Sequence, residues 1–300
     1  MAEAEQCWPE LPLEAWEPTY KTLHLWTQIV GKIQLELTPR VNHWWNTALH
    51  VTSRGLTTRA MPYRGEAVAI EFDFCRHQLE IRTSFGAPRW LALRAQSVAA
   101  FYRELMGALA GLGMAVTINT RPQEMADPIA FDQDETHRSY EAAYAHRCWR
   151  ILLSSAGVFE EFRARFEGKA SPVQFFWGSF DLAVTRFSGR RAPPRQGVIT
   201  SEAYSHECSS LGWWPGGGAV KSAAFYAYTA PAPAGLAAGR LLPPQAYFDA
   251  TLGEFLLSYD TVRAAPSPRQ VILEFAQSAY AAGADLAHWD RAGLERDTGG

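Results

Sequence analysis

The chain has 300 residues, which allows one large domain or two ordinary ones at roughly 150 residues per domain. Its composition, 47% hydrophobic and 20% charged, excludes a disordered tail, a collagen-like fibre and a highly charged coiled coil. The 28 basic and 31 acidic side chains give a formal net charge of −3. No global positive field exists to hold a phosphate backbone, so nucleic-acid binding is not expected.

The N-terminal stretch and the cysteines bear on location. The chain begins MAEAEQCWPELPLEAWEPTYK, without a basic region followed by an apolar run, and no stretch approaches 18 uninterrupted apolar residues. We therefore expect a cytoplasmic location and no membrane contact. The four cysteines lie at least 60 residues apart, at positions 7, 75, 148 and 208, which excludes CxxC redox or zinc-ribbon pairs. We interpret them as inert buried thiols in a reducing compartment.

The first half of the chain predicts a helix, strands and a second helix. Apolar residues recur at helical spacing from Pro18, at the helix start, to Leu37. The aromatic segment 41–47 then follows a proline and is interpreted as a strand. An amphipathic hairpin covers 68–82, where apolar and polar residues alternate. The second helix covers 98–112, with a glycine at its C-terminal cap.

The second half repeats this order at greater length. Residues 119–139 form a polar linker that contains prolines. A helix over about 144–166 is followed by strands, two loops and a last helix near 268–287, which Ser267 would cap. The predicted strands are 174–186, 203–211, 223–229 and 254–259. The loops, 188–201 and 230–246, are rich in Pro, Gly and Ala and are expected to be irregular.

An internal similarity relates the two halves. Val41-Asn42-His43-Trp44-Trp45-Asn46-Thr47 aligns at an offset of 132 residues with Val173-Gln174-Phe175-Phe176-Trp177-Gly178-Ser179, and Ser53-Arg54 with Thr185-Arg186. The strand-rich middle of each half favours an α+β fold over alternating βαβ units. We therefore predict two tandem helix–antiparallel strands–helix halves, 1–118 and 140–300, related by a pseudo-twofold axis and packed as one compact unit.

Several long motifs also carry a family resemblance. These are LHLWTQIVGK (23–32), FFWGSFDLAVTRFSGR (175–190), EAYSHE (202–207) and FYAY (225–228). With them the chain resembles a bacterial family of conserved proteins that is defined only as a domain of unknown function, over about residues 8–295. The resemblance implies membership of that family and no particular activity or cofactor.

The repeat provides candidate ligand-binding residues. Arg54 and Arg186 end the two aligned stretches, 41–54 and 173–186, and a guanidinium offers a planar donor fork that fits a carboxylate or phosphate. Trp45 and Trp177 would form the walls of the same cleft. The alternatives are local ion pairs for the arginines and a role as core filler for the tryptophans.

His206, His43 and Asp181 are the candidates for proton transfer. Asp181 lies within an apolar strand and needs partners if it is buried, and His43 occupies the matching face of the first segment. Glu207, a further ligand-binding candidate, follows His206, but successive strand side chains point to opposite faces, so the two are not expected to act at one centre. Each histidine has the alternative of a hydrogen-bonded structural role.

Lys169 is a further ligand candidate, although it follows Gly168 near a helix end, where a cation also opposes the helix dipole. A polar stripe on the first helix, His24, Gln28 and Lys32, is interpreted as solvent-facing. The acidic linker segment 132–137 lacks the central glycine and terminal glutamate of a calcium loop.

The preferred function is the binding of a small anionic metabolite in an aromatic cleft between the halves, with chemical conversion left open. One alternative is a non-catalytic interaction module with an exposed patch made of Trp213, Trp214, Phe225 and Tyr226. A metal-dependent enzyme is another alternative, because ligands can converge from distant positions. No motif specifies a metal site, a cofactor, a reaction or an oligomeric state.

Overall fold

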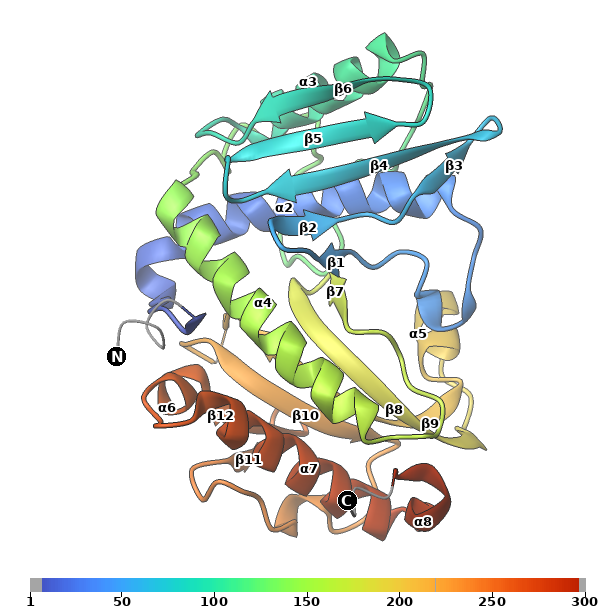
Figure 1. The fold of residues 1–300 in the computed structure, drawn as a ribbon, viewed down its shortest axis with the longest axis vertical. Coiled ribbons are helices and arrows are strands. Elements are labelled where there is room, and N and C mark those ends of the chain that lie inside the picture. The colour runs from blue at the N-terminus through green and yellow to red at the C-terminus, as the bar shows by residue number, and fades with distance from the viewer. Residues whose placement is uncertain (1–6, 219, 297–300) are drawn as a thin grey trace.

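The structure, a computed structural model, describes residues 7–218 and 220–296 and confirms the α+β class. It contains two antiparallel six-stranded sheets, the first above the second in Figure 1. The first has the order β1-β2-β4-β5-β6, with β3 paired to β4, and the second has the order β11-β12-β10-β9-β8-β7. The first sheet comprises β1 (His50–Val51), β2 (Gly55–Thr57), β3 (Met61–Tyr63), β4 (Glu66–Asp73), β5 (Gln78–Thr83) and β6 (Gly86–Ala92). The second comprises β7 (Gln174–Phe176), β8 (Asp181–Arg191), β9 (His206–Trp214), β10 (Ala224–Ala230), β11 (Tyr247–Asp249) and β12 (Glu254–Ser258).

Each sheet packs against two long helices (Figure 1). The helices α2 (Leu13–Leu37) and α3 (Val98–Gly111) pack with the first sheet, and α4 (Ala142–Ala164) and α7 (Pro268–Leu286) cover one face of the second. The remaining helices are short: α5 (Val198–Ala203), α6 (Tyr259–Arg263), α8 (Arg291–Leu294) and the 3-10 turns η1 (Asn42–Trp44) and η2 (Leu236–Ala238). The long helices agree with the predicted ranges because their apolar spacing is a local property of the sequence.

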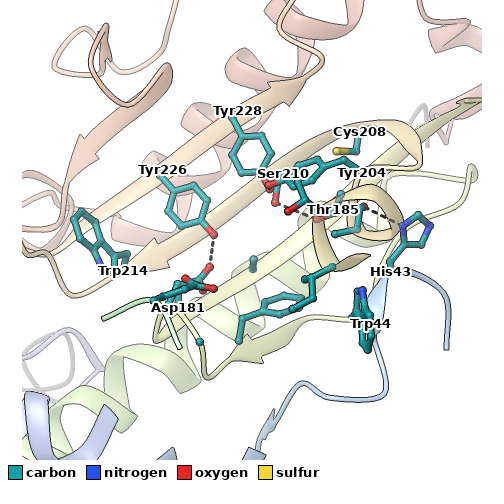
Figure 2. A pocket seen from close by; sticks show the side chains of 18 of the residues that line it. His43, Trp44, Asp181, Thr185, Tyr204, Cys208, Ser210, Trp214, Tyr226 and Tyr228 are labelled. Atoms are coloured by element: carbon teal, nitrogen blue, oxygen red, sulfur yellow. Dashed lines mark hydrogen bonds between the residues drawn. The ribbon is translucent and has the colours of Figure 1, made fainter. Parts of the chain in front are cut away.

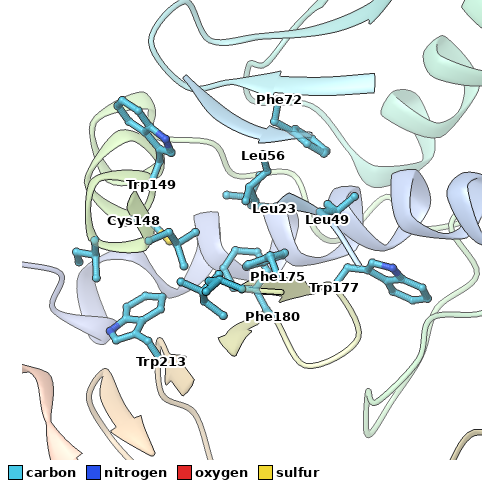
Figure 3. Packing of buried hydrophobic residues seen from close by; sticks show 14 of the residues in the cluster. Leu23, Leu49, Leu56, Phe72, Cys148, Trp149, Phe175, Trp177, Phe180 and Trp213 are labelled. Carbon is cyan, nitrogen blue, oxygen red and sulfur yellow. The ribbon is translucent and has the colours of Figure 1, made fainter. Parts of the chain in front are cut away.

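One buried core joins the two sheets. Leu49, which precedes β1, and Phe175 of β7 exchange two backbone hydrogen bonds of 2.9 and 2.8 Å. Figure 3 shows these residues close to α2, with Phe72 on the first sheet's side and Trp213 on the second's. Hydrophobic residues from both halves thus belong to one cluster.

The second sheet has one covered and one open face. Along β8, Val184 and Arg186 face the helices, whereas Ala183 and Thr185 face the opposite side. This alternation continues across β9, β10 and β12. The open face carries the candidate site, because no long helix covers it.

The predicted aromatic strands are only partly correct. Residues 41–47 form η1 and turns, and the positive φ angles of His43 and Trp44 (58° and 60°) prevent a strand. The predicted strand 174–186 is interrupted at 177–180, where Phe180 also has a positive φ of 58°. The two segments therefore differ in conformation, and the structure does not confirm a pseudo-twofold axis.

Four smaller predictions also change. Pro18 lies inside α2, which begins earlier than expected, and Ser267 precedes α7 without a side-chain cap bond. The loop expected at 188–201 contains the end of β8 and α5. Of the cysteines, Cys148 and Cys208 are buried as predicted, but Cys7 is half-buried and Cys75 is exposed.

The prediction that the polar stripe of α2, made of His24, Gln28 and Lys32, faces solvent is wrong. Lys32 is 4% exposed, and its Nζ donates to the carbonyl of Asn119 at 3.0 Å. Gln28 is fully buried, donates to the carbonyl of Gln123 at 3.0 Å and accepts from its N–H at 2.8 Å. The stripe thus fixes the start of the predicted linker against α2, which satisfies backbone groups that would otherwise be buried without partners.

Candidate functional site

A cavity of about 770 Å³ lies on the open face of the second sheet. Its floor is formed by β8, β9, β10 and β12, and its walls by η1, α5 and the segments at 123–124 and 176–179. Both predicted wall residues, Trp45 and Trp177, line it. Its size is in the range of sites for small organic molecules.

Asp181 is the most buried carboxylate of the cavity. It is 6% exposed and accepts hydrogen bonds from the hydroxyls of Ser179 (2.6 Å) and Tyr226, the latter drawn in Figure 2. Burial raises the pKa of this carboxyl, and the two hydroxyl donors oppose that effect. Because Ser179 and Tyr226 both donate, Asp181 is the acceptor in both hydrogen bonds.

Gly212 allows this arrangement. It lies opposite Tyr226 in the β9–β10 pair, and a Cβ built on it would lie only 2.2 Å from the Cζ atom of Tyr226. The tyrosine ring therefore lies over the glycine and reaches across the sheet to Asp181. Any larger side chain at position 212 would displace the ring.

Further hydroxyl groups extend along the floor (Figure 2). Tyr228 stacks parallel to Tyr226 at 6.2 Å between ring centroids, and its hydroxyl lies 3.1 Å from that of Tyr204. Thr185 and Ser210 pair through their hydroxyls at 3.0 Å. The floor thus offers polar groups between aromatic walls.

Two further carboxylates line the cavity. Glu254 of β12 is half-buried. Its pKa is raised to about 7, mainly by burial and to a smaller extent by the negative charge of Asp181. Glu124 is exposed at the rim of the cavity. Desolvation is the larger cause that raises its pKa, and the negative charge of Asp181 adds to this effect. Within the described residues, neither glutamate has a side-chain hydrogen bond or ion pair with another residue, and Asp181 has no ion pair.

Trp177 forms a wall because α2 leaves room for it. The indole Nε1 donates to the carbonyl of Thr47 at 2.7 Å, and a Cβ on Gly31 of α2 would lie 2.3 Å from the indole ring. The hydrogen bond links the two aromatic segments, although they are not equivalent strands.

His43 lines the cavity at the end opposite Asp181 along β8, next to Phe187. Its Nδ1 lies 3.1 Å from the carbonyl of Ala203, so this nitrogen carries the proton, and its Nε2 accepts from Lys169 at 2.7 Å. Burial is the main cause that lowers the pKa of His43. His43 is therefore a neutral ring with both nitrogens occupied.

His206 and Glu207 do not line the cavity. The ring of His206 lies 5.8 Å from that of His43, between centroids. Glu207 points away, as strand alternation predicts, and pairs with Arg190 at 2.6 Å. Arg190 also donates to the carbonyls of Ala287 and His288 after α7. This contact gives Glu207 a structural partner.

The two candidate anion-binding arginines do not converge. Arg186 is fully buried on the helix-covered face, with its guanidinium carbon 3.5 Å from the centroid of Phe162 and 4.5 Å from that of Tyr280. Arg54 lies in the turn between β1 and β2 of the first sheet and pairs with Asp73 at 2.6 Å. Because neither arginine lines the cavity, the expectation of an anion site built from both is wrong.

The prediction of an exposed aromatic patch is also wrong. Trp213 and Phe225 are fully buried in the core, while Trp214 and Tyr226 line the cavity from the other face of the same strands. Strand alternation separates these neighbours.

The sequence did not predict Glu254, Tyr228 or the role of Tyr226 in the site. A signal was present, since the tyrosines of FYAY are two residues apart and so share a face of β10. Glu254 had no comparable signal, because its position near the tyrosines of β10 depends on the pairing of β10 with β12.

No three His, Cys, Asp or Glu side chains are grouped as metal ligands in residues 7–218 and 220–296. In the same ranges, no helix combines the length and apolar character needed to cross a bilayer.

Fold and site define an α+β protein with a ligand-sized cavity on the open face of its second sheet. Residues 8–296 match the model of the Family of unknown function (DUF5996), and the chain belongs to that family. No curated protein and no solved structure matches the chain.

Proposed function

We propose that the protein binds a small organic molecule, with apolar or aromatic character, in the cavity on the second sheet. The observation that carries the proposal is the cavity itself. About 770 Å³ of space, lined by tryptophans and tyrosines, lies over a sheet whose other face is closely packed. Apolar walls with a few fixed polar groups are typical of small-molecule sites.

The polar groups support binding with a defined orientation. The Asp181 carboxylate is held by two hydroxyl donors, and the hydroxyls of Tyr228 and Ser210 lie along the same floor. A ligand can replace the water that these groups would otherwise contact, while the walls exclude solvent from its apolar part.

A thermal-shift screen of small aromatic and aliphatic compounds tests the proposal. A ligand at 100 times its Kd adds about 2.7 kcal/mol of stability, which is a readily measured shift. We expect hits with the wild type that are lost in Ala183→Phe, because Ala183 points from the β8 floor into the cavity.

Ala69→Phe is the matched control, since Ala69 lies on β4 of the first sheet, outside the cavity lining. This variant should retain every hit. Compounds that stabilise Ala183→Phe as strongly as the wild type would place binding elsewhere, and a wild type without any hit would contradict the proposal.

A further inference from the structure

The charged side chains that line the cavity are all acidic. Among the described residues, the lining contains three carboxylates, those of Glu124, Asp181 and Glu254, and neither lysine nor arginine. Its one basic side chain, His43, is a neutral ring whose two nitrogens are occupied. No described residue forms an ion pair with any of the three carboxylates.

Asp181 is the least expected of the three. A carboxylate at 6% exposure is costly unless its charge is compensated, and its protein partners are two neutral hydroxyls. The fold nevertheless orients it toward the cavity, through the ring that Gly212 allows to cross the sheet. Burial alone favours the neutral form of this carboxyl, and a positively charged ligand group beside it would favour the ionised form.

Aromatic rings lie at the end of the cavity that contains Asp181. Figure 2 shows Trp214 and Tyr226 next to Asp181, and Trp177 also belongs to the lining. The faces of such rings attract cations, by about 0.5–1 kcal/mol at exposed sites and 2 or more when desolvated. Carboxylates beside aromatic faces form an environment suited to an ammonium group.

We propose that the cavity takes a ligand with a protonated amine, seated between Asp181 and Glu254 against the rings of Trp214 and Tyr226. The inference rests on the proposed function and specifies its ligand class. The amine supplies the positive charge that the lining lacks, and the rest of the ligand lies along the aromatic walls toward Phe187.

Three probes that share one ring test the ligand class: 2-phenylethylamine, 2-phenylethanol and 3-phenylpropionate. Affinities are measured by calorimetry at pH 8, above the pKa of about 7 of Glu254. We expect the amine to bind at least about tenfold more tightly than the alcohol, and the acid to bind most weakly.

Asp181→Asn removes the charge and keeps the shape and an acceptor for Tyr226. It should abolish the preference for the amine and leave the affinity for the alcohol within about twofold, whereas loss of binding of all probes would indicate misfolding. Glu254→Gln is the second variant, which should weaken binding of the amine alone, because Glu254 has no hydrogen-bond or ion-pair partner in the part of the chain that the structure describes.

The outcomes separate the two proposals. Equal affinities for amine and alcohol, or a preference for the acid, overturn the cationic ligand class while the cavity remains a binding site. If neither Asp181→Asn nor Glu254→Gln changes the preference for the amine, the amine binds elsewhere and the assignment is wrong. If no probe binds and the compound screen also has no hits, both proposals fail.

Discussion

Glu254 is a carboxylate whose environment favours its neutral form. Burial raises its pKa from 4.5 to about 7, and the negative charges of Asp181 on β8 and Asp249 on β11 add to this effect. Tyr204 and Tyr228 also face this region, and burial raises their pKa values, so both stay neutral near pH 7.

The sign of the resulting pH dependence follows from linkage. Because the folded-state pKa is higher than that of the unfolded chain, folding favours the protonated carboxyl. This contribution to stability is fully present below about pH 4.5 and is lost as the pH rises through about 7.

We therefore predict that Glu254→Gln stabilises the protein at pH 8 by about 1–3 kcal/mol and has little effect at pH 4.5. Urea unfolding of both proteins at pH 4.5, 6 and 8 checks this. Parallel pH profiles for wild type and variant would show that Glu254 ionises with an ordinary pKa.

Arg186 shows how position within a strand decides the role of a residue. Its guanidinium is enclosed by the rings of Phe162, Phe166 and Tyr280 and donates to the carbonyl of Phe162. Burial lowers its pKa to about 10. Its partners belong to α4, α7 and the residues after α4, so its role is to hold helices against the sheet.

At the scale of elements, β9 and β10 build the site through one pair of residues. Gly212 and Tyr226 lie opposite each other, and the tyrosine ring occupies the space where a Cβ on Gly212 would lie. The orientation of Asp181 on β8 therefore depends on a glycine on the neighbouring strand.

We predict that Gly212→Ala destabilises the protein by about 1–3 kcal/mol, because the methyl group forces Tyr226 out of its position, and that it also weakens ligand binding. Gly107→Ala is the matched control. Gly107 is an exposed residue within α3 with no atom within 4 Å of its added Cβ, so alanine there should be neutral or stabilising by up to about 1 kcal/mol.

Thermal unfolding and calorimetric titration with a hit from the screen measure the two variants. If Gly212→Ala keeps wild-type stability and affinity, Tyr226 has another position that serves equally well, and its contact with Asp181 is not required.

The helix α5 forms part of the cavity wall with few apolar contacts of its own. None of its residues is buried, and Ile199, which lines the cavity, is 60% exposed. Its attachment is polar, through the ion pair of Glu202 with Arg40 and the hydrogen bond from His43 to the carbonyl of Ala203. An exposed apolar residue at the cavity suits contact with an apolar ligand.

At the scale of the whole molecule, the two predicted halves share one core. The backbone bonds between Leu49 and Phe175 join the sheets, and Trp149 of α4 donates to the carbonyl of Thr52 in the first half at 3.1 Å. The segment between the halves is also anchored, since Phe131 is fully buried and Lys32 binds the backbone at Asn119.

We therefore predict one cooperative unfolding transition, because few contacts of either half can be lost without exposing the shared core. Urea titrations followed by tryptophan fluorescence and by far-UV circular dichroism should coincide. Two separated transitions, or a folded protein made of residues 140–300 alone, would show that the halves are independent.

The sequence also contained a constraint that separates two of the candidate residues. Asp181 and Arg186 are five positions apart in one strand, and an odd spacing places side chains on opposite faces. Alternation alone therefore shows that both cannot line one cavity within an unbroken strand. The conformation of the aromatic segments could not be predicted in this way. His43 and Phe180 have positive φ angles, and no glycine at these positions indicates them in the sequence.

The sequence by itself determined the α+β class, the long helices and the hairpin of β4 and β5, because helical and strand periodicities act over neighbouring residues. Only the tertiary structure decided which face of the second sheet stays open. Alternation divides β8, β9 and β10 into two faces, but the face that becomes core depends on α4 and α7, which lie far away in the sequence. That choice buried Arg186 among aromatic rings and left Asp181 facing the cavity.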